Sequence, residues 1–211
     1  MNINVELKSY VEKNILQEYD QNDEGHNREH IEFVLKRVFE INKNYNLNVN
    51  MLYAIVCYHD IACHINRDKH EKLSAKRLLA DKELRNFFDE NQMNEMKDAI
   101  EDHRASLEYE PRNIYGKILS SADRKIDVDV YLKSSMGFYI KKEPNVSKED
   151  LFESSYNFAI KKFGRQGYAV NKMYVKDEKY ENFLKEIQYL IDNKSIFIER
   201  AEKVLKDLNW I

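Results

Sequence analysis

The chain has 211 residues, of which 34% are charged and 43% hydrophobic, and its formal net charge is −3 at pH 7. That length is enough for one sizeable core, and the near balance of charge argues against a nucleic-acid partner held on a broad basic surface. Five Gly and two Pro are too few for an all-β protein with many tight turns. We therefore expect an all-α protein.

The cysteines and the apolar runs bear on cellular location. Cys57 and Cys63 lie in or beside one apolar segment, and their spacing indicates neither a zinc knuckle nor a disulfide framework. We find no apolar run of 18 residues and no charged-then-apolar leader. The sequence thus predicts a soluble, cytoplasmic protein with no membrane partner.

Apolar residues recur at helical spacing along most of the chain. A first helix is predicted from Val5 to Tyr19, residues 22–25 break the pattern, and a second helix is predicted from His26 to Asn42. Further helices are predicted over roughly 51–63, 70–80, 81–90, 92–105, 113–134, 149–163, 177–192 and 194–209. Loops are predicted at 141–145 and 163–168.

The pair His59-Asp60 stands inside the apolar stretch 52–62. Burying an imidazole beside a carboxylate costs free energy unless both groups are compensated. A divalent metal compensates both, because it binds histidine nitrogen and aspartate oxygen together. All six histidines lie between positions 26 and 103, whereas a merely solubilising surface would scatter them. The sequence therefore predicts a metal site around this pair.

Other ligand candidates flank the pair. His26 and His30 are four residues apart and share one face of a helix, while Asp123 comes from a later helix. Helical bundles commonly hold metals between facing helices. A lone histidine on an apolar face is usually an ordinary core residue, and we expect His64 to be of that kind or exposed.

Four motifs occur in a characteristic order. They are Gly25-His26-Asn27-Arg28-Glu29-His30, His59-Asp60-Ile61-Ala62, His70-Glu71-Lys72-Leu73-Ser74-Ala75 and Ala122-Asp123-Arg124. In this order and spacing they resemble the HD-domain superfamily of metal-dependent phosphohydrolases, over roughly residues 22–135. The resemblance implies an HD-domain helical bundle with additional C-terminal helices over 136–211. We thus expect a single domain over 1–211.

The resemblance also implies a ligand set. The expected metal ligands are His30, His59, Asp60 and Asp123, and the expected cofactor is a divalent ion: Mn, Mg, Fe, Ni, Co or Zn. We expect one ion, with His70 and His103 hydrogen-bonding phosphate or the ligating carboxylates. The alternative is that these two histidines bind a second ion, with Asp60 bridging. His26 is a further candidate for a second metal or for phosphate.

Two positions depart from the resemblance. Asn27 stands where relatives often carry Asp, and Cys63 stands where several relatives carry a catalytic Glu. A thiol cannot replace a carboxylate base at neutral pH without a strong pKa shift. The general acid or base is therefore expected elsewhere, with Glu71 as the candidate, or a metal-activated water carries the chemistry alone.

Arginines supply the expected phosphate contacts. Arg124, next to Asp123, is the best candidate because a guanidinium matches phosphate geometry bidentately. Arg104 and Arg112 are further candidates, and a solvated surface charge is the other interpretation of both. The predicted catalytic residues are thus Asp60, Glu71 and Arg124.

The resemblance implies hydrolysis of a phosphate ester or anhydride by a metal-activated water. The expected partner is a small phosphorylated substrate, with a nucleotide favoured, and a homodimer is an open option. Two alternatives remain: a non-catalytic metal-binding regulatory HD module, and a di-iron HD-fold oxygenase.

Overall fold

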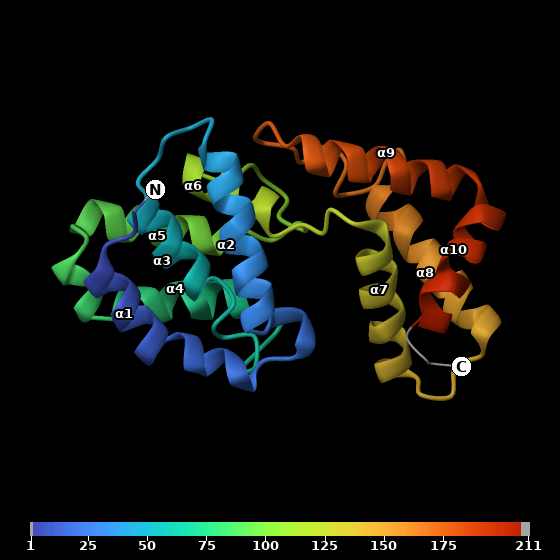
Figure 1. The fold of residues 1–211 in the computed structure, drawn as a ribbon, viewed down its shortest axis with the longest axis horizontal. Helices are drawn as coiled ribbons and strands as arrows, with labels where there is room; N and C mark the ends of the chain where they lie inside the picture. The colour runs from blue at the N-terminus through green and yellow to red at the C-terminus, as the bar shows by residue number, and fades with distance from the viewer. Residues whose placement is uncertain (1, 208–211) are drawn as a thin grey trace. The chain divides into compact units, whose positions relative to one another are not determined.

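The computed structural model describes residues 2–207, and all regular structure in that range is helical (Figure 1). The α-helices are α1 (Val5–Asn14), α2 (Arg28–Asn42), α3 (Val49–Tyr58), α4 (His70–Ala80), α5 (Glu90–Glu101), α6 (Ile114–Ala122), α7 (Val128–Lys142), α8 (Lys148–Phe163), α9 (Glu178–Asp192) and α10 (Lys194–Asp207). Short 3₁₀ helices are η1 (Leu16–Gln21), η2 (Glu24–His26) and η3 (Glu83–Asn86). The prediction of an all-α protein is confirmed.

Backbone contacts divide the chain into two compact units. Unit 1 runs up to Asp123 and includes Tyr174–Lys176, whereas unit 2 contains Arg124–Met173 and the helices that follow Asp177. The boundary falls directly after a predicted metal ligand. That residues 1–211 act as a single domain stays a prediction.

Helix α3 is the centre of unit 1. Every residue from Met51 to Tyr58 is buried, and α1, α2, α4, α5 and α6 all contact the helix. A helix that is apolar on all sides is stable only when other helices surround it. The C-terminal end of this central helix carries His59 and Asp60, which explains how two polar side chains come to lie inside the core.

Short polar side chains start the helices that carry the site. The Asn27 side chain accepts a hydrogen bond from the backbone N of His30 at 3.1 Å, and the Asn48 side chain accepts one from the backbone N of Asn50 at 3.0 Å. These caps satisfy backbone donors that the first helical turn leaves unpaired. Asn27 thus fixes the start of α2, one residue before the turn that presents His30.

The helix predicted over 51–63 ends earlier, at Tyr58. Beyond it the chain turns, and the carbonyl of Asp60 accepts a hydrogen bond from the Asn22 side chain at 3.0 Å. Since a distant side chain satisfies this carbonyl, the helix does not need to continue. The turn places His59 and Asp60 at a helix end, where both can point to one side.

The helix predicted over 113–134 is two helices, α6 and α7. The Asp127 side chain accepts a hydrogen bond from the backbone N of Val130 at 2.9 Å and so caps a new helix at that point. Asp123 consequently lies at the C-terminal end of α6 rather than inside a long helix.

Two other predicted helices are also shorter. The segment predicted over 81–90 forms only the 3₁₀ helix η3, because the Asp81 carboxylate accepts bonds from the hydroxyls of Tyr10 and Tyr58 and from the backbone N of Glu83. The first helix ends at Asn14 and continues as η1. The remaining helices match their predicted ranges to within about one turn (3.6 residues). The end predicted at 209 lies outside the described residues.

Unit 2 has its own core of α7, α8, α9 and α10. Aromatic rings fill it: Tyr131 and Phe183 each meet the ring of Phe163 edge-on with centroids 5.1 Å apart, and Tyr180 stacks on Phe183 at 5.8 Å. Such ring pairs add to the free energy of burial. The C-terminal helices therefore form a separately packed unit.

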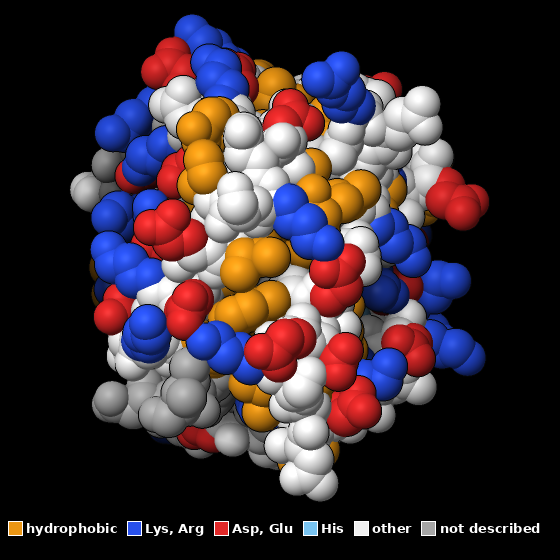
Figure 2. All heavy atoms as spheres, turned by 90° about the vertical axis from the view of Figure 1, so that its right-hand side faces the viewer, with side chains coloured by type: hydrophobic (Ala, Val, Ile, Leu, Met, Phe, Trp, Pro, Cys, Tyr) orange, Lys and Arg blue, Asp and Glu red, His pale blue; other side chains and the backbone are white. Residues whose placement is uncertain are grey.

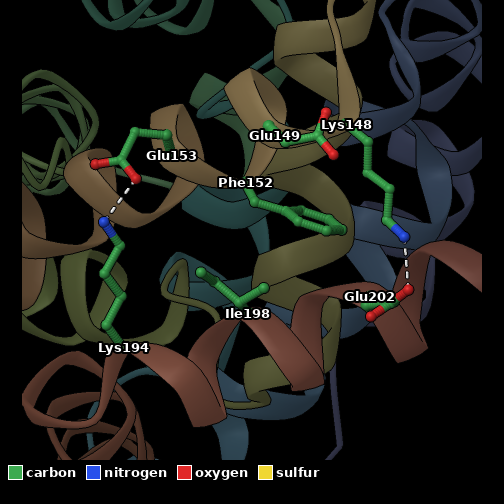
Figure 3. Close-up of a pocket in the computed structure, with 7 residues that line it drawn as sticks. All are labelled: Lys148, Glu149, Phe152, Glu153, Lys194, Ile198 and Glu202. Carbon is green, nitrogen blue, oxygen red and sulfur yellow. Dashed lines mark hydrogen bonds and ion pairs between the residues drawn. The ribbon is translucent and has the colours of Figure 1, made fainter.

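The outer surface of unit 2 carries a groove of about 340 Å³ between α8 and α10 (Figure 3). Phe152 and Ile198 lie between two closed ion pairs. The pairs are Lys148–Glu202 at 2.5 Å and Glu153–Lys194 at 2.6 Å. Because both of its lysines are already paired with carboxylates, this groove does not indicate an anion site.

The molecular face in Figure 2 mixes Lys and Arg, Asp and Glu, and apolar side chains, without one dominant charge. This agrees with the near-balanced composition. Among residues 2–207, no helix is both long and apolar enough to span a membrane.

Candidate metal centre

The His59-Asp60 pair is almost completely withdrawn from solvent, with side chains 0% and 2% exposed. The Nδ1 of His59 lies 2.8 Å from the carbonyl oxygen of Val56, one turn back in α3. Since a carbonyl only accepts, this nitrogen carries the proton and Nε2 presents its lone pair. That tautomer is the one a metal ligand needs.

A first group of ligand atoms gathers around one oxygen of Asp60. Its Oδ2 lies 3.5 Å from the Nε2 of His30 and 3.3 Å from the Nε2 of His59. The Oδ1 of Asp123 lies 3.0 Å and 3.8 Å from the same two nitrogens. One donor atom from each of the four residues lies within 4.8 Å of the others. The structure thus brings together the four predicted metal ligands, from α2, the end of α3 and the end of α6.

A second group gathers around the other oxygen of Asp60. Its Oδ1 lies 3.1 Å from the Nε2 of His70 and 3.4 Å from the Nε2 of His103. The Nδ1 atoms of these histidines lie 2.8 and 2.7 Å from the carbonyl oxygens of Arg67 and Ile100. Both Nε2 atoms therefore present lone pairs, although they are only 3.2 Å apart. Two lone pairs at this distance repel unless a proton or a cation lies between them.

The pKa shifts of the clustered side chains also favour a bound cation. Burial opposes ionisation of His59, yet the carboxylates of Asp60 and Asp123 raise the pKa of His59 well above its ordinary value. Burial likewise opposes ionisation of Asp60, but the surrounding histidines hold the pKa of its carboxyl well below its usual range. The negative cluster attracts positive charge, which a divalent cation could supply in place of protons.

Buried polar atoms without hydrogen bonds provide an independent test. Among the described residues they include both ring nitrogens of His30, the Nε2 of His59 and the Oδ1 of Asp60. Unpaired buried polar groups cost free energy and are rare in folded proteins. A set of imidazole nitrogens and carboxylate oxygens fits Zn, Fe, Mn, Ni or Co. These residues therefore fit a divalent ion.

His26 lies at the edge of the cluster. A ring nitrogen of His26 is within 4.8 Å of an Asp60 oxygen and of the Cys63 thiol, and its ring meets that of His30 edge-on. Its Nδ1 lies 2.7 Å from the Oδ1 of Asp23. His26 is thus beside the metal ligands but has a carboxylate partner of its own.

The predicted arginines have different surroundings. Arg112 forms ion pairs with Asp98, Glu101 and Asp102, at 2.7, 2.7 and 2.8 Å. All its charge is thereby directed at the protein's own carboxylates. This favours the structural interpretation of Arg112 over the phosphate-binding one.

Arg104 and Glu71 lie next to each other. The Nη1 of Arg104 donates to the carbonyl of Asp68 at 2.8 Å and lies 3.4 Å from the Oε2 of Glu71. The same Oε2 is 3.8 Å from the Nδ1 of His70. Glu71 therefore lies behind His70, on the side away from its ligand nitrogen.

Among the described residues, Arg124 has no carboxylate partner, and an aromatic ring lies against its guanidinium. Its side chain is buried, and none of its three guanidinium nitrogens makes a hydrogen bond to a described residue. The guanidinium carbon lies 4.8 Å from the centre of the Tyr180 ring, within unit 2. A buried guanidinium with unused donors calls for an anion.

Sequence reasoning missed several residues that support the cluster. The sequence predicts that residues 22–25 break the helical pattern and can cap the next helix; in the structure the Asn22 side chain also donates to the carbonyls of both His26 and Asp60, each at 3.0 Å. The hydroxyl of Tyr19 accepts a bond from the backbone N of Asp60 at 3.3 Å. The signal available was the pair Asn22-Asp23, which is separated from His26 by two residues, but its long-range partners could not be predicted from the sequence.

Comparison with known proteins agrees with the motifs. A solved structure described as the crystal structure of a predicted HD superfamily hydrolase, from an uncultured Thermotogales bacterium, is 20% identical, covers 74% of this chain and 86% of its own, and has a TM-score of 0.46. A search among curated proteins found no match. Residues 27–125 match the family model of the HD domain, and this segment contains every residue of both ligand groups. The resemblance to HD domains that the four motifs indicate is confirmed over residues 27–125.

Proposed function

We propose that the protein is a metal-dependent phosphohydrolase with two divalent ions in the cluster around Asp60. The observation that carries the proposal is the arrangement of this buried carboxylate, each of whose oxygens faces two histidine Nε2 atoms. His30, His59 and Asp123 would hold one ion, His70 and His103 would hold the other, and Asp60 would be shared between the two groups. The facing lone pairs of His70 and His103 favour two ions over the single ion expected from the sequence.

Divalent ions in such a site polarise a phosphoryl oxygen and lower the pKa of water towards roughly 7. The protein's own part is to fix the ligand geometry. The carbonyls of Val56, Arg67 and Ile100 set the tautomers of three histidines, as outer-shell acceptors commonly do for metal-binding imidazoles.

We also propose Arg124 as the residue that contacts the phosphoryl group, because its buried guanidinium makes no hydrogen bond to a described residue. It is joined to Asp123 by one peptide bond, so its Cα lies about 3.8 Å from that of a ligand. A guanidinium offers a fork of donors to a phosphoryl group and stabilises the negative charge of phosphoryl transfer. The substrate class we favour is a small phosphate ester or anhydride, and a nucleotide is the first to test.

One experiment distinguishes the proposed phosphohydrolase from the two alternatives, a regulatory module and a di-iron oxygenase. The wild-type protein is loaded with Mn²⁺, its metal content is measured, and phosphate release is followed over a panel of nucleotides and simple phosphate esters. The proposal expects metal-dependent phosphate release. A metal-bound protein without turnover would favour the regulatory module. An iron charge-transfer band together with oxygen consumption would favour the oxygenase.

A matched pair of variants tests the phosphate contact. Arg124→Ala is expected to lower kcat/KM by about 10- to 1000-fold, the range for losing one charge-stabilising donor, and to leave metal content unchanged. Arg112→Ala is the control, because its partners are the protein's own carboxylates; it is expected to keep kcat/KM. Equal activity in the wild type and Arg124→Ala would remove Arg124 from the proposed site.

A further inference from the structure

His26 differs from the neighbouring histidines in the partner of its Nδ1. In His59, His70 and His103 this nitrogen faces a backbone carbonyl. In His26 it lies 2.7 Å from the Oδ1 of Asp23, a carboxylate. A carboxylate partner makes an imidazole a better proton acceptor at its other nitrogen than a carbonyl partner does, because it stabilises the imidazolium that forms.

The Asp23–His26 pair is held firmly in place. The Oδ1 of Asp23 also accepts the backbone N–H of Gly25 at 2.9 Å, and its Oδ2 forms an ion pair with Arg67. The Nη1 of Arg67 lies 3.2 Å from the Nδ1 of His26. Since an ionised Asp23 is acceptor-only and lies closer, Nδ1 carries the proton and directs it to Asp23.

Asn22 couples this pair to the metal ligands. Its side-chain amide donates to the carbonyls of both His26 and Asp60, each at 3.0 Å. A shift of the loop at residues 22–26 relative to the end of α3 would therefore break two hydrogen bonds. The imidazole thus has a fixed position beside Asp60.

The His26 ring lies beside the cluster and is partly exposed to solvent. Among the described residues, no protein group forms a hydrogen bond with its Nε2. The His26 side chain is 20% exposed, whereas those of His30 and His59 are 6% and 0% exposed. A lone pair at the rim of the cluster is where a water molecule and a substrate can both reach it.

We propose that His26, oriented by Asp23, is a catalytic residue that accepts a proton from the attacking water. This rests on the proposed phosphohydrolase function. An O–H bond of the water breaks, its proton goes to Nε2, and its oxygen forms the new bond to phosphorus. The bond from phosphorus to the leaving oxygen breaks, that oxygen keeps the electron pair and takes a proton from solvent, and the imidazolium returns its proton to solvent.

Other nearby groups are less suited to this task. Burial and the charge of Asp60 raise the pKa of the Cys63 thiol far above its ordinary value, so it stays a thiol at neutral pH. The carboxylate of Glu71 contacts Arg104 and the Nδ1 side of His70, away from the ligand nitrogens.

The test compares His26→Ala with His64→Ala. His64 is an exposed neighbour whose Nδ1 lies 3.1 Å from the side-chain oxygen of Asn22. His26→Ala is expected to lower kcat by about 10²- to 10⁴-fold, the usual contribution of a general base, with unchanged metal content and KM near that of the wild type. Added imidazole is expected to restore part of kcat in His26→Ala alone, because the deleted ring leaves space for it. His64→Ala is expected to behave as the wild type.

A second variant and a measurement without turnover complete the test. Asp23→Asn is expected to lower kcat, because an amide does not fix the Nδ1–H tautomer or stabilise imidazolium. In the metal-free protein, ¹⁵N–¹H correlation spectra are expected to report the Nδ1–H tautomer for His26 in the wild type and its loss in Asp23→Asn.

Each contrary result has a distinct meaning. Loss of metal in His26→Ala would make His26 a ligand, and an unchanged kcat, or a lower kcat that imidazole does not restore, would overturn the catalytic role. A wild-type protein that releases phosphate from no substrate overturns the proposed function itself, and the tautomer spectrum then reports only on the Asp23–His26 pair.

Discussion

Asp60 and Asp102, both buried in unit 1, have their negative charge compensated in opposite ways. The side chain of Asp102 is 0% exposed and accepts bonds from the backbone N, Nε and Nη2 of Arg112 at 2.9, 2.8 and 2.8 Å, and from the hydroxyl of Tyr109 at 3.0 Å. The side chain of Asp60 is 2% exposed, and its two oxygens face the imidazoles of His30, His59, His70 and His103. Asp102 is thus paired with the guanidinium of Arg112, whereas Asp60 has no such cationic partner among the described residues.

This difference in partners indicates that Asp102 has a structural role, whereas Asp60 is a candidate metal ligand. Arg112 remains charged at any physiological pH, so Asp102 is neutralised whenever the protein is folded. The imidazoles around Asp60 direct Nδ1 to backbone carbonyls at His59, His70 and His103, which leaves their Nε2 atoms as acceptors. A ring of acceptors around an anion requires a cation from solution. The same contrast separates Arg112, whose donors are used, from Arg124, whose donors are not.

The largest effect that this comparison predicts is on metal retention. Asp60→Asn keeps the size of the side chain but removes the charge shared by both groups, so metal content after dialysis is expected to fall to near zero. The melting temperature of the wild type is expected to drop on adding chelator, because an ion bound only to the folded state stabilises it by about 3–4 kcal/mol at 100 to 1000 times its Kd. Calorimetry with and without chelator, alongside elemental analysis, measures both effects.

Asp102→Asn is the matched control for Asp60→Asn. It is expected to keep its metal and its response to chelator, since Asp102 faces Arg112 and not the histidines. If Asp102→Asn lost metal as completely as Asp60→Asn, the two aspartates would not differ in kind and the comparison would fail.

The next effect is on metal stoichiometry. We expect two ions per chain in the wild type and one in both His70→Ala and His103→Ala, because these histidines contact only the Oδ1 side of Asp60. Titration of metal-free protein followed by elemental analysis counts the ions. A wild-type value of one, unchanged in either variant, would restore the single-ion prediction made from the sequence.

The sequence predicted the helical class and the gathering of His30, His59, Asp60 and Asp123. Burial of a polar pair in an apolar stretch predicts a metal site around His59 and Asp60, because a metal compensates both groups. The order of the motifs, through the family resemblance, added His30 and Asp123. It did not predict the end of α3 at Tyr58, since that end depends on Asn22, a residue 36 positions earlier. Local periodicity contains no information about such long-range hydrogen bonds.

The two candidate arginines illustrate the same limit. Arg112 and Arg124 each lie near polar motifs, and residue type alone made both of them phosphate candidates. Only the fold reveals that three carboxylates surround Arg112 and that Arg124 packs on Tyr180 with unused donors. Tertiary contacts determine whether an arginine is already paired with carboxylates. They therefore decide between a structural and a functional interpretation of each arginine.

The smallest predicted effect is the pH dependence contributed by Asp102. Burial opposes its ionisation, but bonds from Arg112 and Tyr109 lower the pKa of this carboxyl below its ordinary value in the folded state. A group with a lowered folded-state pKa stabilises the protein above its unfolded pKa of about 3.9, and that stability is lost as pH falls through the folded pKa. At pH 7, Asp102→Asn is expected to cost about 1.5–3 kcal/mol, the range for hydrogen bonds to a charged group.

The measurement is urea unfolding of metal-free wild type and Asp102→Asn between pH 7 and pH 3, so that metal release does not contribute. The difference in the free energy of unfolding is expected to be constant down to about pH 4, near the unfolded-state pKa, and to shrink below it. Because the histidine cluster titrates equally in both proteins, it cancels in this difference. A difference that grows on acidification would mean that Asp102 is protonated in the folded protein, and its ion pair with Arg112 would then not be the contrast to Asp60 that the structure indicates.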